Sequence, residues 1–157
     1  MSVVEGKRGI KLTIYVMTLS KNFKLSEFTY SQVAKKYNID NSTSQAFIIN
    51  NLKELCQQVL QPLRDKIEKP IIITSGYRCL KLNEKVGGVP TSQHVYGQAC
   101  DFKVDEISSY EIAKAVLELY LPFDQMILYD DFVHISISPR DRRQLLYNKS
   151  YNGNKLD

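Results

Sequence analysis

Tryptophan, histidine and cysteine are scarce in this sequence of 157 residues, which contains none, two and three of them. The three cysteines form no Cys-x-x-Cys pair, so neither a disulfide framework nor a zinc ribbon is indicated. Cys56 is expected in the core. Cys79 and Cys100 are expected as small buried thiols, and the sequence leaves open whether they pair.

Long apolar runs and flexible linkers are missing as well. No apolar run approaches the roughly 20 residues of a membrane-spanning helix, so we expect no stable membrane insertion. The lack of repeats, low-complexity tracts and Pro/Gly/Ser-rich linkers favours a single domain over residues 1–157. Residues 7–17 join a basic start to a short apolar stretch but lack a small-residue cleavage site. They are therefore predicted to be a strand or an extension, not an export signal.

The charge balance is mildly basic, with a net charge of +4. Such a surplus favours polyanionic surfaces such as nucleic acid, anionic lipid or bacterial wall polymer. No recognisable motif interleaves aromatic and basic residues, so we expect no nucleic-acid partner. We also expect a monomer. One local basic cluster is interpreted as the solvated face of a helix and consists of Arg140, Arg142, Arg143 and Lys149.

The first half of the chain is predicted to be helical, after an N-terminal extension over residues 1–21. Residues 25–37 are expected to form one short helix. Apolar residues then recur at intervals of three and four over residues 44–67, which predicts a longer helix. Pro62 has no backbone N–H, so it should kink this helix or divide it in two.

The second half is predicted to contain strands that return on one another. The predicted strands are residues 71–74 (a buried strand), 99–104, 125–129 and 132–138. Ser108 and Glu111 form a predicted capping box for a helix between the second and third of these strands. Asp130 and Asp131 supply the turn between the last two strands. This order predicts an α+β fold, in which a helical N-terminal half packs on a small antiparallel sheet.

Two segments have no regular element assigned to them. Residues 75–98 are rich in Gly and Pro and show little periodicity, and a loop of this length inside a compact domain is usually functional. Residues 139–157 are expected to form a C-terminal helix or tail.

The two histidines are candidates for one metal site. His94 lies in the long loop, and His134 alternates with apolar neighbours on the last predicted strand, so that it shares the polar face. A catalytic zinc site uses three protein ligands and leaves one position open, and imidazole and carboxylate groups both serve as ligands. Asp101 is the natural third ligand, because Gly97 can turn the chain between His94 and Asp101. We therefore predict that the sheet carries a zinc site.

A metal-dependent hydrolase also needs a general base and a positive charge near the substrate carbonyl. Asp131 lies three residues before His134 at the predicted turn and is our candidate base. Asp130 is its rival, and the spacing alone does not choose between them. Arg78 directly follows the predicted strand over residues 71–74, with a glycine two residues before it, and is the candidate cation.

These residues resemble a known signature. The stretch SGYRCLKLNEKVGGVPTSQHVYGQACD, residues 75–101, resembles the pattern of the D-alanyl-D-alanine carboxypeptidase-like zinc peptidases. That pattern runs S-G-Y-R, then N, then V-G-G, then S-x-H-x-x-G-x-A-x-D. Residues 131–134, DFVH, resemble the family's D/E-x-x-H, and the resemblance extends over about residues 22–138.

The resemblance implies a set of site residues. It implies one zinc ion held by His94, Asp101 and His134, with Asp131 as the general acid/base and Arg78 stabilising charge at the scissile carbonyl. The candidate substrate-binding residues are Ser92, Tyr77 and Gln98. The sequence departs from some relatives at Tyr129, where they carry an acidic residue, and at Asp131, where many carry glutamate.

The resemblance also implies a substrate and a place of action. Its members cut peptide bonds in the stem peptides of bacterial peptidoglycan, as D,D-carboxypeptidases, D-Ala-D-Ala dipeptidases or endolysin-type L-alanyl-D-glutamate endopeptidases. We expect synthesis in the cytoplasm and action at the bacterial cell wall, with a phage gene as one possible origin. The alternative is a non-catalytic module of a phage or wall-associated assembly that binds wall peptides without cutting them.

Overall fold

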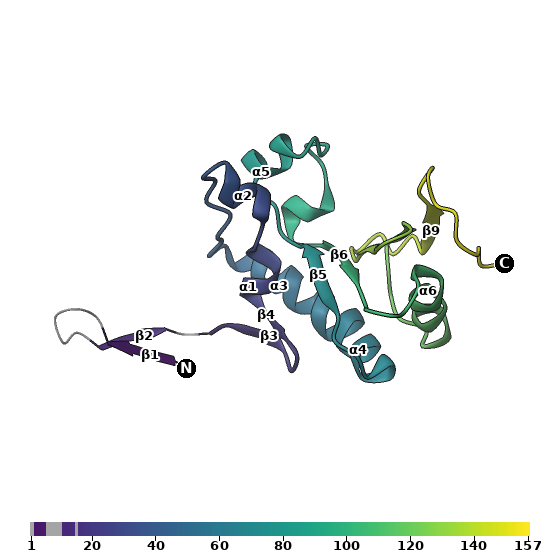
Figure 1. Ribbon diagram of the computed structural model, residues 1–157, viewed down its shortest axis with the longest axis horizontal. Helices are drawn as coiled ribbons and strands as arrows, with labels where there is room; N and C mark the ends of the chain where they lie inside the picture. Colours follow the sequence, from purple (N-terminus) through teal and green to yellow (C-terminus); the bar gives the residue numbers. More distant parts are fainter. Residues whose placement is uncertain (1, 6–10, 15) are drawn as a thin grey trace.

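The computed structural model describes residues 2–5, 11–14 and 16–157 and has a mixed α+β fold (Figure 1). The N-terminal elements are β1 (Ser2–Glu5), β2 (Lys11–Ile14), β3 (Thr18–Ser20), β4 (Phe23–Lys24), α1 (Leu25–Thr29), α2 (Gln32–Lys36), α3 (Ala46–Leu55), a π-helical segment (Cys56–Leu60) and α4 (Gln61–Ile67). They are followed by β5 (Ile72–Ser75), α5 (Leu80–Lys85), a 3₁₀ helix (Gln93–Tyr96), β6 (Ala99–Lys103), α6 (Ser109–Glu118), β7 (Gln125–Leu128), β8 (Val133–Ser136) and β9 (Gln144–Tyr147).

The main sheet has five strands in the order β5-β6-β8-β7-β9. The pairs β5–β6, β6–β8 and β7–β8 are antiparallel, as the sequence predicts, whereas β9 pairs with β7 in parallel. The expectation of a purely antiparallel sheet is therefore corrected to a mixed one. The short hairpin β1–β2 extends away from the body in Figure 1, and part of the predicted segment 7–17 lies outside the described residues.

The predicted helices exist, but they are interrupted. The first one is split into α1 and α2, because Tyr30 is extended (ψ 135°) and the Ser31 hydroxyl caps α2 by accepting from the Ala34 backbone N–H. In the long helix, the residues just before Pro62 form a π-helical turn, in which the Gln61 N–H donates to the Cys56 carbonyl. Pro62 cannot donate a backbone hydrogen bond, and the wider turn absorbs this without breaking the helix axis.

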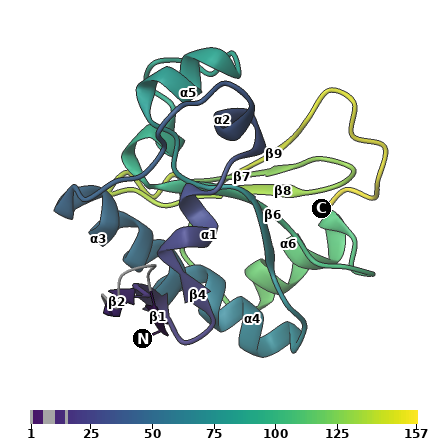
Figure 2. The ribbon, with the colours of Figure 1, turned by 60° about the vertical axis from the view of Figure 1, so that its left-hand side comes forward.

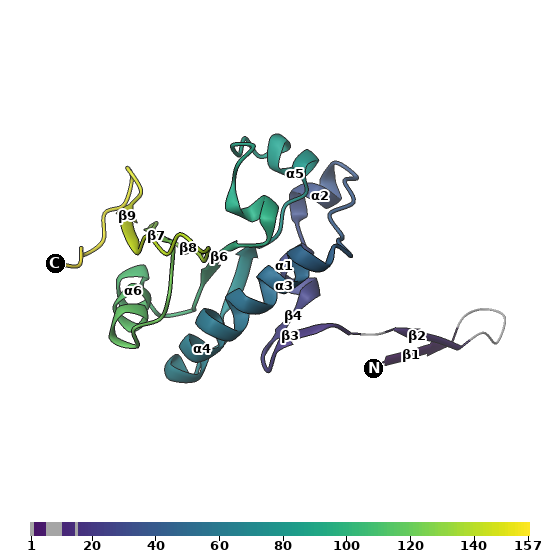
Figure 3. The ribbon, with the colours of Figure 1, turned by 180° about the vertical axis from the view of Figure 1, so that it is seen from behind.

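One face of the sheet packs on helices and forms the core. Cys100 and Phe102 of β6, Met126 of β7 and Ile135 of β8 are fully buried in one cluster. The apolar stripe of the long helix and the apolar side of α6 complete this cluster, with Leu52, Leu55, Val59, Leu63, Ile112 and Val116. Figures 2 and 3 show α4 and α6 on this side of the sheet, with the segment that contains α5 rising on the other side.

Three expectations for individual segments need correction. Strand β5 is an edge strand with partly exposed side chains, not a buried strand, because the sheet ends there. The predicted loop over residues 75–98 contains α5 and a 3₁₀ helix, because Cys79 and Ser92 act as their N-caps. Residues 139–157 form strand β9 and loops where a helix or tail was expected. The predicted capping box of Ser108 and Glu111 is present at the start of α6.

Candidate metal centre

The open face of the sheet presents two of the three predicted ligands side by side. Asp101 on β6 pairs directly opposite His134 on β8, and the His134 Nδ1 atom lies 2.9 Å from the Asp101 Oδ1 atom. Their neighbours along each strand, Cys100 and Ile135, point into the core instead. The strict alternation of strand side chains therefore separates a reactive face from a packed one.

His94 completes the group from the 3₁₀ helix above the sheet. Its backbone N–H lies 3.4 Å from the Ser92 hydroxyl that caps this helix, and Gly97 ends the helix in the left-handed region, with φ of 70°. The His94 Nδ1 atom lies 2.8 Å from the Gly76 carbonyl oxygen. A carbonyl only accepts, so Nδ1 carries a proton here, and Nε2 is the nitrogen that faces Asp101. A backbone carbonyl that orients a ligand histidine in this way is usual in metal sites.

The close packing of Gly76 holds this carbonyl in place. A Cβ atom at residue 76 would lie 2.6 Å from both the Cα and the carbonyl oxygen of Phe28 in α1. Real Cβ atoms do not approach backbone atoms so closely, so only glycine lets β5 pass α1 at this distance. The contact between α1 and Gly76 therefore fixes the orientation of the His94 ring, through the hydrogen bond between His94 and the Gly76 carbonyl.

The three side chains fit a metal ion. One ligand atom of each, from His94, Asp101 and His134, lies within 4.8 Å of the other two. The His94 Nε2 atom is 3.4 Å from the Asp101 Oδ1 atom. Ligand atoms bound to one tetrahedral zinc ion at about 2.0–2.2 Å lie roughly 3.3–3.6 Å apart. Two imidazoles and one carboxylate thus converge with a spacing that a small contraction or expansion would adapt to zinc.

Asp101 is in the chemical form that binds metals. Burial raises the pKa of its carboxyl, but hydrogen bonds from His134 and His94 outweigh burial and hold this pKa well below its ordinary value. The side chain is 17% exposed, so one side of it is open to solvent. Asp101 is therefore a carboxylate at neutral pH and is accessible to an ion or a substrate.

Arg78 is fixed beside this group by its surroundings. Its backbone N–H donates to the His94 carbonyl, and its Nη1 donates to the Asn83 side-chain oxygen at 3.0 Å. Asn41 fastens the backbone on both sides of Arg78, since it donates to the Tyr77 carbonyl and accepts from the Cys79 N–H. Burial lowers the pKa of Arg78, and its buried Nε–H has no hydrogen-bond partner among the described residues. Arg78 thus keeps one buried donor without a partner, while its side chain lines the site.

Two cavities meet at the candidate site. The larger one, of about 600 Å³, lies between α2 and β5 and includes Tyr30, Val33 and Ile73 among its walls. The smaller one, of about 460 Å³, contains the two histidines. Arg78 and Asp101 line both cavities. The site therefore has space on two sides.

The predicted substrate-binding residues lie in different places. Ser92 lines the smaller cavity, and Tyr77 is 6% exposed and lines the larger one. Gln98 lines a third cavity, next to Pro122 and Ile137, away from the metal-binding group. The roles of all three in substrate binding stay predictions.

The two candidate bases are both exposed at the β7–β8 turn. Asp130 accepts two hydrogen bonds from Asn152, and thus fastens the C-terminal segment. Asp131 is exposed and is not among the residues that line the two cavities at the site. Among the described residues, Asp101 is the only acid in the walls of these cavities. The role of Asp131 stays a prediction.

Tyr129 occupies the wall of the smaller cavity and was singled out in the sequence only as a departure from relatives. Its ring stacks on Phe132, with ring centres 4.2 Å apart, and the Ser109 hydroxyl contacts the carbonyls of both residues. Burial raises the pKa of Tyr129, and the nearby Asp101 raises it further. The phenol is thus a hydrogen-bond donor at neutral pH.

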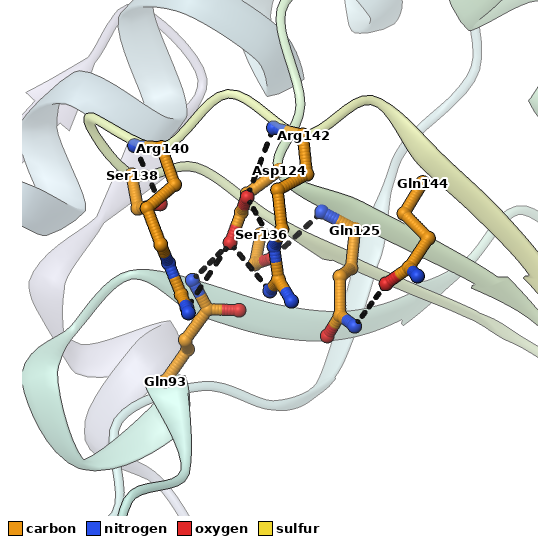
Figure 4. Close-up of polar contacts among 8 residues, drawn as sticks. All are labelled: Gln93, Asp124, Gln125, Ser136, Ser138, Arg140, Arg142 and Gln144. Carbon is orange, nitrogen blue, oxygen red and sulfur yellow. Dashed lines mark hydrogen bonds and ion pairs between the residues drawn. The ribbon is translucent and has the colours of Figure 1, made fainter.

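A buried carboxylate that the sequence analysis missed supports the rim of the site (Figure 4). Asp124 is fully buried and receives three hydrogen bonds from Arg142, at 2.8 to 3.1 Å. Gln93, the residue before His94, donates to the same carboxylate at 2.9 Å. The expectation of a solvated helix face is therefore wrong: the cluster lies in the loops around β9 and not in a helix, and Arg142 is paired with Asp124. The positive charge of Arg142 did not reveal this pair in the sequence, because Asp124 lies 18 residues earlier in the chain.

The comparison with known proteins decides the family. The model of the family described as Peptidase M15 matches residues 21–136, which is most of the chain. The chain belongs to the M15 peptidase family. M15 peptidases are zinc-dependent, and in this M15 chain the group of His94, Asp101 and His134 could bind the metal. The resemblance seen in the sequence is thus confirmed at the level of the family.

Three further observations concern relatives, membrane-spanning helices and cysteines. No curated protein matches the chain. In the part of the M15 peptidase that the structure describes, no helix is both long enough and apolar enough to span a membrane. Cys56, Cys79 and Cys100 are all free thiols, so the pairing that the sequence left open is not formed.

Proposed function

We propose that this M15 peptidase is a zinc-dependent enzyme that hydrolyses peptide bonds in the stem peptides of bacterial peptidoglycan. The observation that carries the proposal is the convergence of His94, Asp101 and His134 on the open face of the sheet, with two cavities meeting beside them. A metal site of this kind, with a free approach for a ligand, is typical of catalytic and not of structural sites.

The three ligands and Arg78 have different roles: the ligands would hold the zinc ion, and Arg78 would stabilise negative charge on the substrate. When bound, zinc would supply a Lewis acid and would lower the pKa of a coordinated water molecule. Arg78 lines both cavities, and its guanidinium group would donate to the oxygen of the scissile carbonyl, where negative charge develops in the transition state. Asn83 and Asn41 keep Arg78 in position for this contact.

Proton transfer is assigned to Asp131, which would take a proton from water and pass it to the leaving amine. Its exposed position means that the β7–β8 turn would have to bend towards the cavity when substrate binds. Tyr129 is already in the cavity wall, and its hydroxyl would donate a hydrogen bond to the developing oxyanion. The two residues thus have separable roles: Asp131 would act as the base, and Tyr129 as a hydrogen-bond donor.

The site leaves room for substrate on both sides of the metal-binding group. A carboxypeptidase needs a closed pocket for the last residue, whereas an endopeptidase needs space beyond the cleaved bond on either side. The cavities of about 600 and 460 Å³ favour an endopeptidase that cuts within the stem peptide. D,D-carboxypeptidase activity is the narrower alternative. We further propose that the enzyme acts at the bacterial cell wall.

A non-catalytic binding module is the second candidate. One observation favours it: Asp131 is absent from the walls of both cavities, so the general base is not preassembled. Such a module would bind a stem peptide and leave it intact.

The decisive experiment is digestion of purified peptidoglycan by the zinc-loaded protein, with the released fragments identified by mass spectrometry. Chelated protein and the variants Asp131→Asn, Asp130→Asn and Tyr129→Phe are run in parallel. New amine and carboxyl ends that vanish on chelation and in Asp131→Asn would support the peptidase and identify the bond. Tyr129→Phe should reduce turnover without abolishing it, and Asp130→Asn should leave it unchanged.

Other outcomes contradict parts of the proposal. Full activity in Asp131→Asn, together with loss in Asp130→Asn, would transfer the base to Asp130. Intact stem peptides despite bound zinc, with peptidoglycan from several wall types, would exclude the peptidase and favour the binding module.

A further inference from the structure

The smaller cavity is rimmed by positive charge. Arg78, Arg140 and Arg142 all line it, and the only acid in its wall, among the described residues, is Asp101. Asp101 is engaged with the two histidines, so its charge is not available to balance three guanidinium groups. A bound metal cation would make the cavity more positive still. Its electrostatics therefore favour an anionic group.

Arg142 is not the free cation of this rim. Its Nε and Nη2 form a two-point contact with Asp124, and its backbone N–H adds a third bond. The Asp124 side chain has no exposed surface, and its pKa is held well below the ordinary value mainly by the hydrogen bond with Arg142. Arg142 and Asp124 thus neutralise each other and form a fixed wall of the cavity.

Arg140 is the surplus cation (Figure 4). A carboxylate has about four lone-pair sites, and those of Asp124 face four closer donors: three from Arg142 and one from Gln93. The Arg140 Nη2 atom lies 3.5 Å away, as the fifth and most distant donor. Its side chain is 61% exposed, so most of its fork of N–H groups faces solvent.

We infer that Arg140 binds a carboxylate of the peptide substrate and thereby determines which peptides enter the smaller cavity. The inference rests on the proposed peptidase function. A guanidinium group matches a carboxylate with two parallel hydrogen bonds, and the long contact to Asp124 points Arg140 towards the cavity without consuming it. The larger cavity shares Arg78 with the smaller one but has no further cation in its wall among the described residues, and its side with Tyr30, Val33 and Ile73 suits the uncharged part of the peptide.

Two carboxylates of a stem peptide have the required chemistry. One is the C-terminal carboxylate, and the other is the free α-carboxylate of the γ-linked D-glutamate. Each is adjacent to one of the bonds that the proposed function considers. The carboxylate that Arg140 recognises would therefore also indicate the bond that is cut.

The test measures binding separately from hydrolysis. The probe is the synthetic pentapeptide L-Ala-γ-D-Glu-L-Lys-D-Ala-D-Ala with an N-terminal fluorophore, in three forms: both carboxylates free, the C-terminus amidated, or the glutamate α-carboxylate amidated. Fluorescence anisotropy gives the Kd for metal-free protein in the wild type, Arg140→Ala, Arg140→Lys and Arg64→Ala. Arg64 lies on α4, outside the cavity walls, and controls for the loss of one arginine.

The expected result is a specific loss of discrimination. Amidation of one of the two carboxylates should weaken binding to the wild type about tenfold or more, as is typical of a charge-assisted hydrogen bond. Arg140→Ala should bind the free peptide as weakly as the wild type binds that amide, and should no longer distinguish the two. Arg140→Lys should recover part of the affinity, and Arg64→Ala should behave as the wild type.

Two results would overturn the inference. The first is a wild type that does not discriminate among the three peptides, including one that binds none of them. The second is an equal loss of affinity for all three peptides in Arg140→Ala, which indicates a purely structural residue. Hydrolysis is measured separately, with zinc-loaded protein. Discrimination among the peptides without cleavage would contradict the proposed peptidase function and support the carboxylate site at Arg140. Cleavage without discrimination would support the peptidase function and contradict the carboxylate site.

Discussion

Two carboxylates of this protein, Asp101 and Asp124, have the same chemical group but different roles: Asp101 belongs to the candidate metal site, and Asp124 to a structural ion pair. The Asp124 side chain is fully buried and that of Asp101 mostly so, and hydrogen bonds hold the pKa of each well below the ordinary value. The partners of Asp101 are two histidines, whose ring nitrogens are also metal ligands. The main partner of Asp124 is an arginine, which keeps its charge at every accessible pH. The choice of partner, more than the degree of burial, thus separates a reactive carboxylate from a structural one.

The largest effect should follow from Asp101→Asn. Loss of even an outer partner of a ligand histidine typically reduces metal affinity about 10–100-fold, so loss of a ligand should reduce zinc affinity more than ~100-fold. Hydrolysis should disappear with the metal. Because asparagine keeps the volume of the side chain, the far-ultraviolet circular dichroism should not change. Zinc affinity is measured by competition with a chromophoric chelator.

The matched control for Asp101→Asn is Asp131→Asn, which removes one carboxylate and leaves the three ligands intact. It should retain wild-type zinc affinity and lose turnover. Zinc binding by Asp101→Asn at the wild-type level would remove Asp101 from the metal site.

Asp124→Ala should damage stability and not primarily chemistry. The change leaves the Arg142 guanidinium without its partner, and breaking a buried ion pair from one side costs about 3–5 kcal/mol in the free energy of unfolding. Since Arg142 is 36% exposed, the lower end is expected. Urea unfolding measures the loss.

A surface ion pair provides the comparison for Asp124→Ala. Lys69→Ala breaks the exposed pair with Glu106 and should cost far less than Asp124→Ala, because both side chains are open to solvent. Equal costs for the two variants would show that the Asp124 network contributes no more than an exposed pair.

Gly76→Ala should act on the metal from a distance. The added methyl group would collide with the α1 backbone at Phe28, displace the Gly76 carbonyl and release the His94 ring. Loss of such an outer partner should lower zinc affinity about 10–100-fold. Ile72→Ala, at an exposed position of β5, the strand that ends just before Gly76, should leave zinc affinity unchanged. An unaltered affinity in Gly76→Ala would mean that the ring is held by the metal alone.

The smallest effect concerns pH. The folded-state pKa of Asp124 lies below the unfolded value of about 3.9, so the unfolded state takes up its proton first as pH falls. The stability from this group is fully present above about pH 5 and is lost as pH falls towards the folded-state pKa. The free energy of unfolding of Asp124→Asn should therefore fall less steeply than that of the wild type between pH 5 and 3. Urea unfolding at several pH values measures the two slopes.

The sequence predicted the parts of the fold and site that depend on local patterns. Alternation along β8 put His134 on the face opposite Ile135, and the capping box located the start of α6. The convergence of the two histidines with Asp101 followed from composition and from the family signature together. These signals lie within a few residues or in a fixed motif.

The sequence could not predict features that depend on partners distant in the chain. Arg142 and Asp124 are a pair only because β9 lies parallel to β7, and nothing in the residues of β9 specifies that pairing. Likewise, the reach of Gly76 to both Phe28 and His94 depends on packing between segments 18 to 48 residues apart. Tyr129 was noticed in the sequence as a departure from relatives. Its position in the cavity wall could not be predicted, because it depends on how the strands of the sheet are arranged.

The pairing of Asp101 directly opposite His134 couples metal binding to the register of β6 and β8. A slip of one residue would turn the ligands of one strand into the core and bring Cys100 or Ile135 to the open face, because strand side chains alternate with a period of two. Such a misfolded sheet would lack the ligand set. Metal binding would therefore stabilise only the sheet with the native register. In a cell that supplies the ion, it would disfavour sheets with shifted strands.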